Sequence, residues 1–342
     1  MIEKVNIEEC KEGDILADDV LNDQGIILVA RDTILNDYII LKLKALKANI
    51  LSVYRYEEDS DQAEANFLKT YQENLFHVKE MLEDLARGNN LDYQIVNRIT
   101  KSIYQSIKDC GSIVKYLLTL KNADEYSYTH SLNTALYAMM ISTWLGLSEI
   151  EIEQSIQAGL LHDIGKSLIP NEILNKKGRL NEEEFEIIKK HTIYGYHMLD
   201  DAKEICSEIK KAVLYHHERM DGSGYPYRIS LKEVNIYSRI IAVADVFDAM
   251  TSDRVYKKRV TPFDAFEMFL TNGMGIFDPK IIRTFTKKMA NHFVGTKTKL
   301  SNEEEGEIVF IPPYDVLSPI ILTQSGYIDL SKDESLKIIS IL

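Results

Sequence analysis

Histidine and aspartate side chains that could bind a metal ion gather in the middle and second half of this sequence. Seven of its eight histidines follow residue 120, and five of them have neighbours that could support chemistry: His130, His162, His191, His216 and His217. Imidazole nitrogens combined with carboxylate oxygens suit first-row divalent metals such as Fe, Mn, Ni or Zn, whereas calcium and magnesium prefer shells of oxygen alone. The residue types therefore indicate a transition-metal site.

An adjacent histidine and aspartate stand out in the apolar segment 158–166. Asp163 has two carboxylate oxygens and could bridge two ions, while His162 could bind one of them. We expect this segment to be a single helix. Lys166 would then share a face with His162, where its ammonium could meet a phosphate oxygen or a leaving alkoxide. A buried hydrogen-bonded His–Asp pair beside a solvated lysine is the alternative interpretation of this segment alone.

The remaining candidates lie in three later segments. His191 follows a charged helical pattern at 181–190 and, by itself, would be a surface histidine. His216 and His217 end an expected helix and precede the loop 218–226, whose two glycines and proline allow close approach to a ligand or simply form a linker turn. Asp245 lies inside an apolar helical pattern, where a carboxylate is costly unless it binds a metal or pairs with Arg239 or Arg254.

Taken in order, these blocks resemble the HD-GYP phosphodiesterases. The blocks are residues 126–131 (YSYTHS), 162–166 (HDIGK), His191, 216–218 (HHE), 221–226 (DGSGYP), 243–249 (VADVFDA) and 252–257 (SDRVYK). The resemblance covers about residues 124–258. It implies an all-α HD-superfamily domain, a metal cluster that often contains iron or manganese, and cleavage of cyclic di-GMP to linear pGpG or onward to GMP.

The resemblance also assigns roles to individual residues. It implies seven metal ligands, with Asp163 as the bridging carboxylate: His130, His162, Asp163, His191, His216, His217 and Asp245. It implies that Lys166 assists catalysis at the scissile phosphate and that Tyr225, Arg254 and Lys257 contact the substrate. Members that hold a third metal carry a glutamate where this chain has Tyr126. We therefore expect two divalent ions, Fe or Mn, with Ni or Zn as alternatives.

These residues predict a metal-dependent phosphodiesterase that hydrolyses cyclic di-GMP with a metal-bridging hydroxide. One alternative keeps this chemistry and changes the substrate to another cyclic dinucleotide, such as cyclic GMP-AMP, or to a linear nucleotide. A second alternative is a non-catalytic receptor for a cyclic dinucleotide. The intact set of seven ligands favours the enzyme over the receptor.

The elements that must position these residues predict a mainly α protein with four segments. Residues 1–58 read as a small α+β domain that could be regulatory, with strands at 15–20, 25–29 and 50–56 and a helix at 36–48. Residues 59–120 read as a helical connector, broken at 88–90, that could pair in a homodimer. Residues 121–297 form the expected all-α catalytic domain. Residues 298–342 contain β-like runs at 307–311, 318–323, 327–330 and 336–342, which we expect to pack on the helical domain.

Composition limits the partners and the compartment. The formal net charge of −13 opposes binding to long nucleic acids. The uncharged stretch 131–148 is interrupted by polar residues, so we expect a buried core helix and no membrane span. Three scattered cysteines, Cys10, Cys110 and Cys206, and a start that lacks the pattern of a secretory signal predict a cytoplasmic protein whose mature chain begins here.

Overall fold

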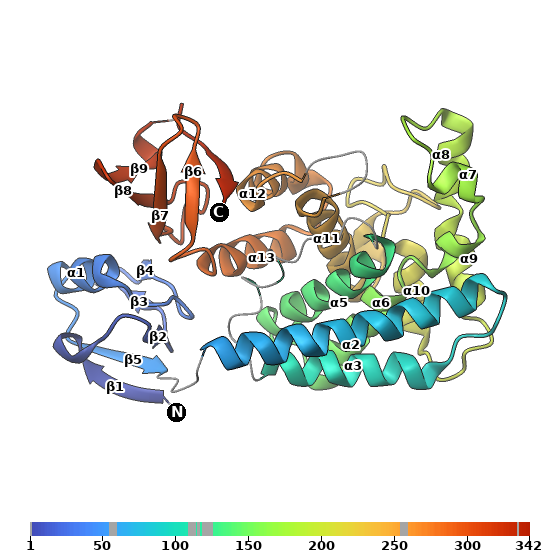
Figure 1. Ribbon diagram of the computed structural model, residues 1–342, viewed down its shortest axis with the longest axis horizontal. Coiled ribbons are helices and arrows are strands. Elements are labelled where there is room, and N and C mark those ends of the chain that lie inside the picture. The colour runs from blue at the N-terminus through green and yellow to red at the C-terminus, as the bar shows by residue number, and fades with distance from the viewer. Residues whose placement is uncertain are drawn as a thin grey trace. The chain divides into compact units, whose positions relative to one another are not determined.

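The computed structural model describes residues 2–54, 60–108, 114, 117, 126–253, 259–333 and 335–342 (Figure 1). The chain divides into two compact units. The first contains Met1–Ser60, Thr261–Glu267 and Thr286–Leu342, and the second contains Asp61–Val260 and Met268–Phe285. The N-terminal and C-terminal segments therefore belong to one unit. The three boundaries between the four segments inferred from the sequence remain predictions, because a unit of packing need not be an independently folding domain.

The second unit is helical and carries every described candidate residue of the site. Its α-helices are α2 (Ser60–Ala86), α3 (Tyr93–Lys108), α5 (Tyr126–Trp144), α6 (Glu149–Leu161), α7 (Asn171–Leu174), α8 (Glu182–Lys189), α9 (His191–Met198), α10 (Ser207–Tyr215) and α11 (Ile236–Thr251). Two more, α12 (Pro262–Leu270) and α13 (Pro279–Asn291), contribute to both units. Short 3-10 turns connect them, among them η2 (Ile164–Leu168) and η4 (Asn272–Gly275). The mainly α class predicted from the sequence is confirmed.

Helix α5 forms the centre of this unit. It packs against α6 and α11, and its apolar side chains from Leu132 to Ile141 are buried. Several of its polar members are buried too, among them Ser142, whose Oγ donates to the Ala138 carbonyl one turn earlier, which satisfies the hydroxyl inside the helix. The expected core helix is thus present, but it ends at Trp144 rather than at residue 148. No helix within the described ranges is both long and apolar enough to cross a bilayer.

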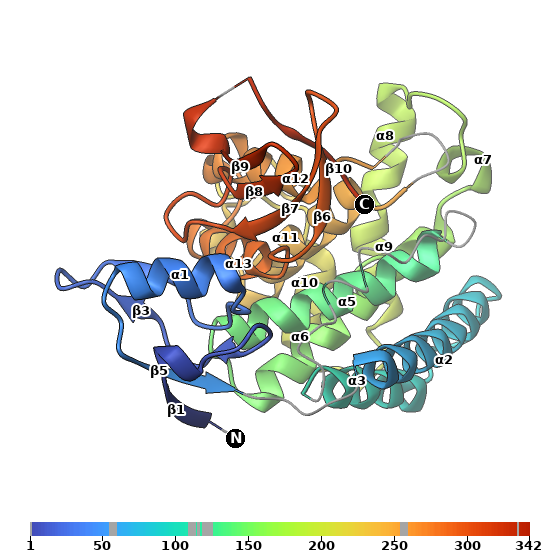
Figure 2. The ribbon, with the colours of Figure 1, turned by 60° about the vertical axis from the view of Figure 1, so that its left-hand side comes forward.

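Helices α2 and α3 correspond to the two helices predicted for the connector at residues 59–120. Figures 1 and 2 show them side by side, and Asn74 of α2 donates to Ser102 of α3. The chain reverses after Gly88, which has a positive φ of 86° that favours glycine. The break expected at residues 88–90 is confirmed.

Among the described residues, the first unit contains three sheets, helix α1 and parts of α12 and α13. Near the N-terminus are β1 (Ile2–Asn6), β2 (Ile15–Leu16), β3 (Val20–Leu21), β4 (Ile27–Val29), α1 (Asp37–Ala45) and β5 (Ile50–Tyr54). Strand order is β1-β5-β2, while β3 pairs only with β4 among the described strands. The single strand expected at 15–20 was therefore wrong, because its two ends pair in different sheets. Strand β1 was not predicted.

The C-terminal segment is a five-stranded antiparallel sheet. Its strands are β6 (Lys297–Leu300), β7 (Glu305–Phe310), β8 (Ile320–Thr323), β9 (Gly326–Asp329) and β10 (Ile338–Ile341), in the order β10-β6-β7-β8-β9. The four expected β-like runs correspond to β7 to β10, and β6 was not predicted. Asn36 donates its side-chain amide to the Val309 carbonyl, and Lys288 pairs with Asp32 at 2.8 Å. These contacts join the two ends of the chain within the first unit.

Candidate metal centre

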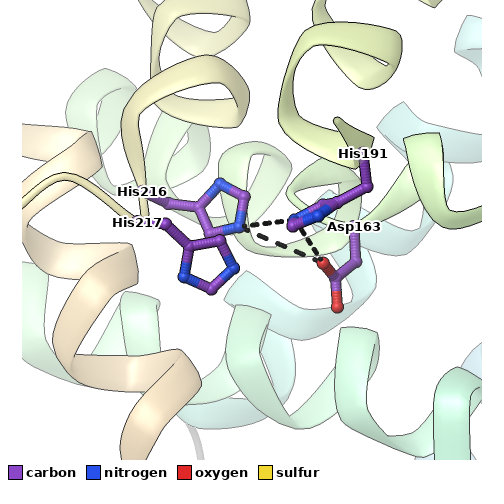
Figure 3. A group of neighbouring side chains, drawn as sticks. All are labelled: Asp163, His191, His216 and His217. Atoms are coloured by element: carbon purple, nitrogen blue, oxygen red, sulfur yellow. Dashed lines mark hydrogen bonds and ion pairs between the residues drawn. The ribbon is translucent and has the colours of Figure 1, made fainter. Parts of the chain in front are cut away.

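All seven residues predicted as metal ligands lie together in the second unit. They form two groups, and within each group the possible ligand atoms lie within 4.8 Å of one another. One group contains Asp163, His191, His216 and His217 (Figure 3), and the other contains His130, His162 and Asp245. Helices α5, α9 and α11 contain His130, His191 and Asp245, whereas the other four residues directly follow the ends of α6 and α10: His162, Asp163, His216 and His217. The structure therefore brings the seven side chains together, and their roles as ligands remain a proposal.

The His162–Asp163 pair lies at a change of helix type. Helix α6 ends at Leu161 with His162 as its C-cap, Asp163 has a non-helical backbone, and the 3-10 turn η2 starts at Ile164. The single helix expected over 158–166 was wrong. Lys166 nevertheless reaches the centre, because residues three apart lie on the same side of a 3-10 turn, and its ammonium donates to Oδ2 of Asp163.

Three imidazoles are held in one orientation by the backbone. The Nδ1 atoms of His162, His191 and His216 lie 2.8, 2.7 and 2.8 Å from the carbonyl oxygens three residues earlier, those of Gly159, Ile188 and Val213. A carbonyl oxygen can only accept, so Nδ1 carries the proton and Nε2 carries the lone pair. This arrangement is typical of histidines that bind metals through Nε2.

These lone pairs face one another without a proton between them. His191 Nε2 and His216 Nε2 are 3.4 Å apart, and Asp163 Oδ1 lies 3.3 Å from the first and 4.0 Å from the second (Figure 3). His162 Nε2 and Asp163 Oδ1 are buried and have no hydrogen-bond partner among the described residues. Such a set of unpaired acceptors is costly unless a cation lies among them. The residues present therefore fit a divalent metal.

The carboxylate of Asp163 faces both groups. Oδ1 lies near His191, as described above, whereas Oδ2 lies 3.2 Å from His162 Nε2 and 3.6 Å from His130 Nε2. Each oxygen therefore contacts the imidazoles of a different group. This is the geometry that a bridging carboxylate needs.

Asp245 closes the second group from helix α11. Its Oδ1 lies 3.1 Å from His130 Nε2, and its Oδ2 lies 3.9 Å from His217 Nδ1. The alternative pairing with Arg239 is wrong, because that guanidinium contacts Asp278 at 3.3 Å. Arg254, the other alternative partner, lies outside the described residues. The buried carboxylate is thus surrounded by imidazoles and has no arginine or lysine partner among the residues that the structure describes.

Burial and neighbouring charges fix the protonation of the site. Burial lowers the pKa of His191 to about 4 and that of His217 to about 3, and it also lowers the pKa of His216. These imidazoles are therefore neutral near pH 7, which is the form that binds metal. Burial lowers the pKa of His130 as well, but its hydrogen bonds to Asp245 and Asp248 outweigh this and raise it to about 9.

The two carboxylates of the site are ionised. Burial favours their neutral form, but the imidazoles around them, and for Asp163 also the Lys166 ammonium, outweigh burial and hold both pKa values well below the usual range. Ionised Asp163 and Asp245 can therefore act as anionic ligands at neutral pH.

Asp248 belongs to the site, although the sequence assigned it no role. It is buried, its Oδ2 lies 2.7 Å from His130 Nδ1, and its Oδ1 accepts from Asn133 Nδ2 at 2.9 Å. A signal was available: residues three apart share a helix face, so Asp248 had to lie beside Asp245.

The loop after His217 covers one side of the centre. Tyr225 places its ring 4.6 Å from the His217 ring, between centroids, and its backbone N–H donates to the His217 carbonyl. A Cβ on Gly224 would lie 2.4 Å from that same carbonyl oxygen, so only glycine permits this close approach. Glu218 is buried and accepts from the Tyr227 N–H at 2.7 Å, which ties the loop to the helix end. Arg254 and Lys257, the other predicted substrate contacts, lie outside the described residues.

Comparison with known proteins agrees with this picture. Residues 113–281 match a family described as HD domain. The cyclic di-GMP phosphodiesterase PA4108 of Pseudomonas aeruginosa is 33% identical over 242 residues, which cover 71% of this chain and 58% of the relative. A cyclic di-GMP phosphodiesterase of Thermotoga maritima is 31% identical, covering 72% and 62%. The 3'3'-cGAMP-specific phosphodiesterase 2 of Vibrio cholerae is 28% identical, covering 66% and 40%. The chain thus spans less than two thirds of the length of each of these relatives.

A solved structure shares the fold. Bd1817, an HDG"Y"P protein from Bdellovibrio bacteriovorus, aligns with a TM-score of 0.54 at 16% sequence identity, covering 83% of this chain and 98% of that protein.

The helical unit and its His/Asp groups define a divalent-metal-binding domain of the HD superfamily. Within that superfamily, this chain belongs to the HD-GYP type, which confirms the resemblance seen in the sequence.

Proposed function

We propose that this protein is a metal-dependent phosphodiesterase that hydrolyses cyclic di-GMP to linear pGpG. The observation that carries the proposal is the position of Asp163, whose two oxygens each contact the imidazoles of a different group. The names of the relatives from Pseudomonas aeruginosa and Thermotoga maritima support the substrate.

The metal centre of this proposal contains two divalent ions, Fe or Mn, with Ni or Zn as alternatives. His191, His216 and His217 would hold one ion, His130, His162 and Asp245 would hold the other, and Asp163 would bind both. When bound, such ions supply positive charge to a phosphate and lower the pKa of water. His191 and His216 contribute by being neutral and fixed through Nδ1, so that these two ligands need little reorganisation on binding.

Other side chains would bind and orient the substrate. The Lys166 side chain is 35% exposed, so its ammonium can donate to a phosphate oxygen while it stays beside Asp163. Tyr225, held against His217 by the loop backbone, would orient the ligand at the edge of the centre. We further propose that Arg254 and Lys257 contact phosphate oxygens.

The end product in this proposal is pGpG. Tyr126 stands where relatives with a third metal carry a glutamate, so this chain lacks that carboxylate ligand at that position. Accumulation of GMP as the main product would contradict the two-metal proposal.

The test uses the full chain, purified anaerobically and loaded with Mn²⁺ or Fe²⁺, with cyclic di-GMP as substrate and separation of products by chromatography. Elemental analysis gives the metal content of the same sample. We expect pGpG from the wild type, and we expect Asp163→Asn to abolish both metal loading and turnover, because the amide removes the charge that both groups share. Asp200→Asn is the matched control, since Asp200 pairs with a histidine, His197, at an exposed position. Turnover by metal-depleted Asp163→Asn would refute the scheme.

A second candidate substrate is cyclic GMP-AMP, supported by the likeness to the Vibrio cholerae phosphodiesterase 2. Faster turnover of cyclic GMP-AMP than of cyclic di-GMP in the same assay would favour it. Tight binding of either dinucleotide without hydrolysis by metal-loaded protein would instead favour a receptor.

Two further statements belong to the proposal. We place the protein in the cytoplasm, because its three cysteines, Cys10, Cys110 and Cys206, are odd in number and widely scattered along the sequence. We also propose a homodimer formed through α2 and α3, which sedimentation of the full chain would test.

A further inference from the structure

We infer that Tyr71 of helix α2 is a positioning residue of the metal centre, acting through Asn133 and Asp248 on His130. The inference rests on the metal-binding part of the proposed function and not on the identity of the substrate. Tyr71 lies outside residues 113–281, the range that matches the HD domain. The helical connector would therefore complete a centre that the family motifs alone do not describe.

A continuous series of hydrogen bonds joins Tyr71 to the centre. The Tyr71 hydroxyl donates to Asn133 Oδ1 at 2.9 Å, and Asn133 Nδ2 donates to Asp248 Oδ1 at 2.9 Å. The other oxygen of Asp248 lies 2.7 Å from His130 Nδ1. The series ends at His130 Nε2, which is 3.1 Å from Asp245 Oδ1.

The direction of every bond in the series is fixed by chemistry. The carboxylate of Asp248 can only accept, so the Asn133 amide must turn its NH₂ group toward it and its oxygen toward Tyr71. The hydroxyl of Tyr71 then has to donate. At the other end, Asp248 accepts from Nδ1–H of His130, so Nε2, which faces Asp245 in the metal-free protein, is the ring nitrogen left for a metal ion, which would replace its proton.

All four side chains are sealed from solvent. Tyr71 is 3% exposed, Asn133 8%, Asp248 1% and His130 3%. Water therefore cannot readily replace a polar group that is removed from this series of hydrogen bonds. Without the hydroxyl, the oxygen of Asn133 loses this donor, and the amide is free to rotate away from Asp248.

Loss of the Tyr71 hydroxyl should weaken metal binding without abolishing it. Asp248 Oδ1 also accepts from Ser252 Oγ at 3.0 Å, so losing the Asn133 contact would loosen the carboxylate without freeing it. Loss of a group that orients a metal ligand typically weakens metal binding by about 10- to 100-fold. Because Tyr71 acts through two intervening side chains, we expect the lower end of that range.

Tyr71→Phe tests the hydroxyl alone, since the ring can keep its packing against Phe67 at 6.0 Å between centroids. The matched control is Tyr237→Phe in the same unit. Tyr237 is 6% exposed and its hydroxyl donates to Gln154 Oε1 at 2.5 Å, so the control also deletes a hydrogen bond between a buried tyrosine and a side-chain amide. The Tyr237–Gln154 bond does not include a residue of the metal centre.

The experiment titrates metal-free full chain with Mn²⁺ by calorimetry and records urea unfolding in parallel. We expect both variants to unfold at similarly lowered urea concentrations, whereas only Tyr71→Phe should lose about tenfold in Mn²⁺ affinity. Wild-type affinity in Tyr71→Phe, or an equal loss in both variants, would overturn the inference, as would absence of Mn²⁺ binding by the wild type. If the wild type binds Mn²⁺ but hydrolyses no cyclic dinucleotide, the proposed activity fails while the titration still decides the role of Tyr71.

Discussion

The contact between η2 and helix α9 should be the least tolerant point of the metal centre. A Cβ added to Gly165 would lie 2.0 Å from the His191 carbonyl oxygen and 2.4 Å from the Gly195 amide nitrogen. Both atoms belong to the backbone, so no side chain can turn aside to make room. Gly165→Ala must therefore push η2 and α9 apart.

The structure gives the size of this displacement. Ordinary van der Waals contact starts at 3.4 Å, so the two segments must separate by about 1.4 Å at this point. His191 is the first residue of α9, and its Nε2 lies only 3.3 Å from Asp163 Oδ1. Overpacking of this kind costs about 1–3 kcal/mol. Since both obstacles are backbone atoms, we expect about 3 kcal/mol of lost stability and a metal affinity at least about tenfold weaker.

Urea unfolding of the full chain, with and without Mn²⁺, measures both effects. Gly275→Ala is the control: Gly275 lies in another 3-10 turn, η4, and a Cβ there would meet no atom within 4 Å. We expect the control to stay within about 0.5 kcal/mol of the wild type. If Gly165→Ala unfolds at the wild-type midpoint and keeps its Mn²⁺ affinity, the close contact between η2 and α9 is wrong, and so is the placement of His191.

Two other predictions concern charge in the centre. Lowering the pH of metal-free protein from about 7 to about 5.5 should reduce the free energy of unfolding by about 3 kcal/mol. The unfolded chain binds protons below about pH 6.5, whereas folded His191, His216 and His217, whose pKa values are lowered, do not. His130, whose pKa is raised to about 9, offsets only part of this loss. Urea midpoints across this range measure the effect, and midpoints independent of pH would contradict it. Lys166→Met should lower kcat for cyclic di-GMP by about 10- to 100-fold with Mn²⁺ affinity retained, because the ammonium would contact phosphate; unchanged kcat in steady-state assays would remove Lys166 from the proposed machinery.

Sequence motifs located the site but not its internal geometry. Their order indicated that seven residues would converge, and the structure brings those seven together. The motifs did not reveal that His162, His191 and His216 share a bond from Nδ1 to a carbonyl three residues earlier, because this depends on how each helix ends. Hydrophobic periodicity likewise could not reveal the change from α-helix to 3-10 turn after Leu161, since buried residues continue through both.

The fold was predictable where the signals were local. Asn36 caps α1 by accepting from the Ile39 N–H, and the predicted helix began there. The same side chain donates to the Val309 carbonyl, a contact that no local pattern could show. Strands β1 and β6 were missed for a related reason: β1 has the sequence IEKVN and β6 has KTKL, so neither presents a continuous apolar run, and β1 becomes a strand by pairing with the distant β5.

The charges around the site indicate a bound metal ion without reference to any protein family. Asp245 could not have paired with Arg239, because residues six apart on a helix lie about 120° apart around its axis. That leaves two ionised, buried carboxylates, Asp163 and Asp245, whose nearest described cations are the Lys166 ammonium and the protonated His130 ring. Both cations contact oxygens that face His130, His162 and Asp245. In the group around His191, the Nε2 atoms of His191 and His216 and the Oδ1 atom of Asp163 are therefore three acceptors that lie close together. A metal ion relieves that arrangement, and the lowered pKa values of the imidazoles disfavour its relief by a proton.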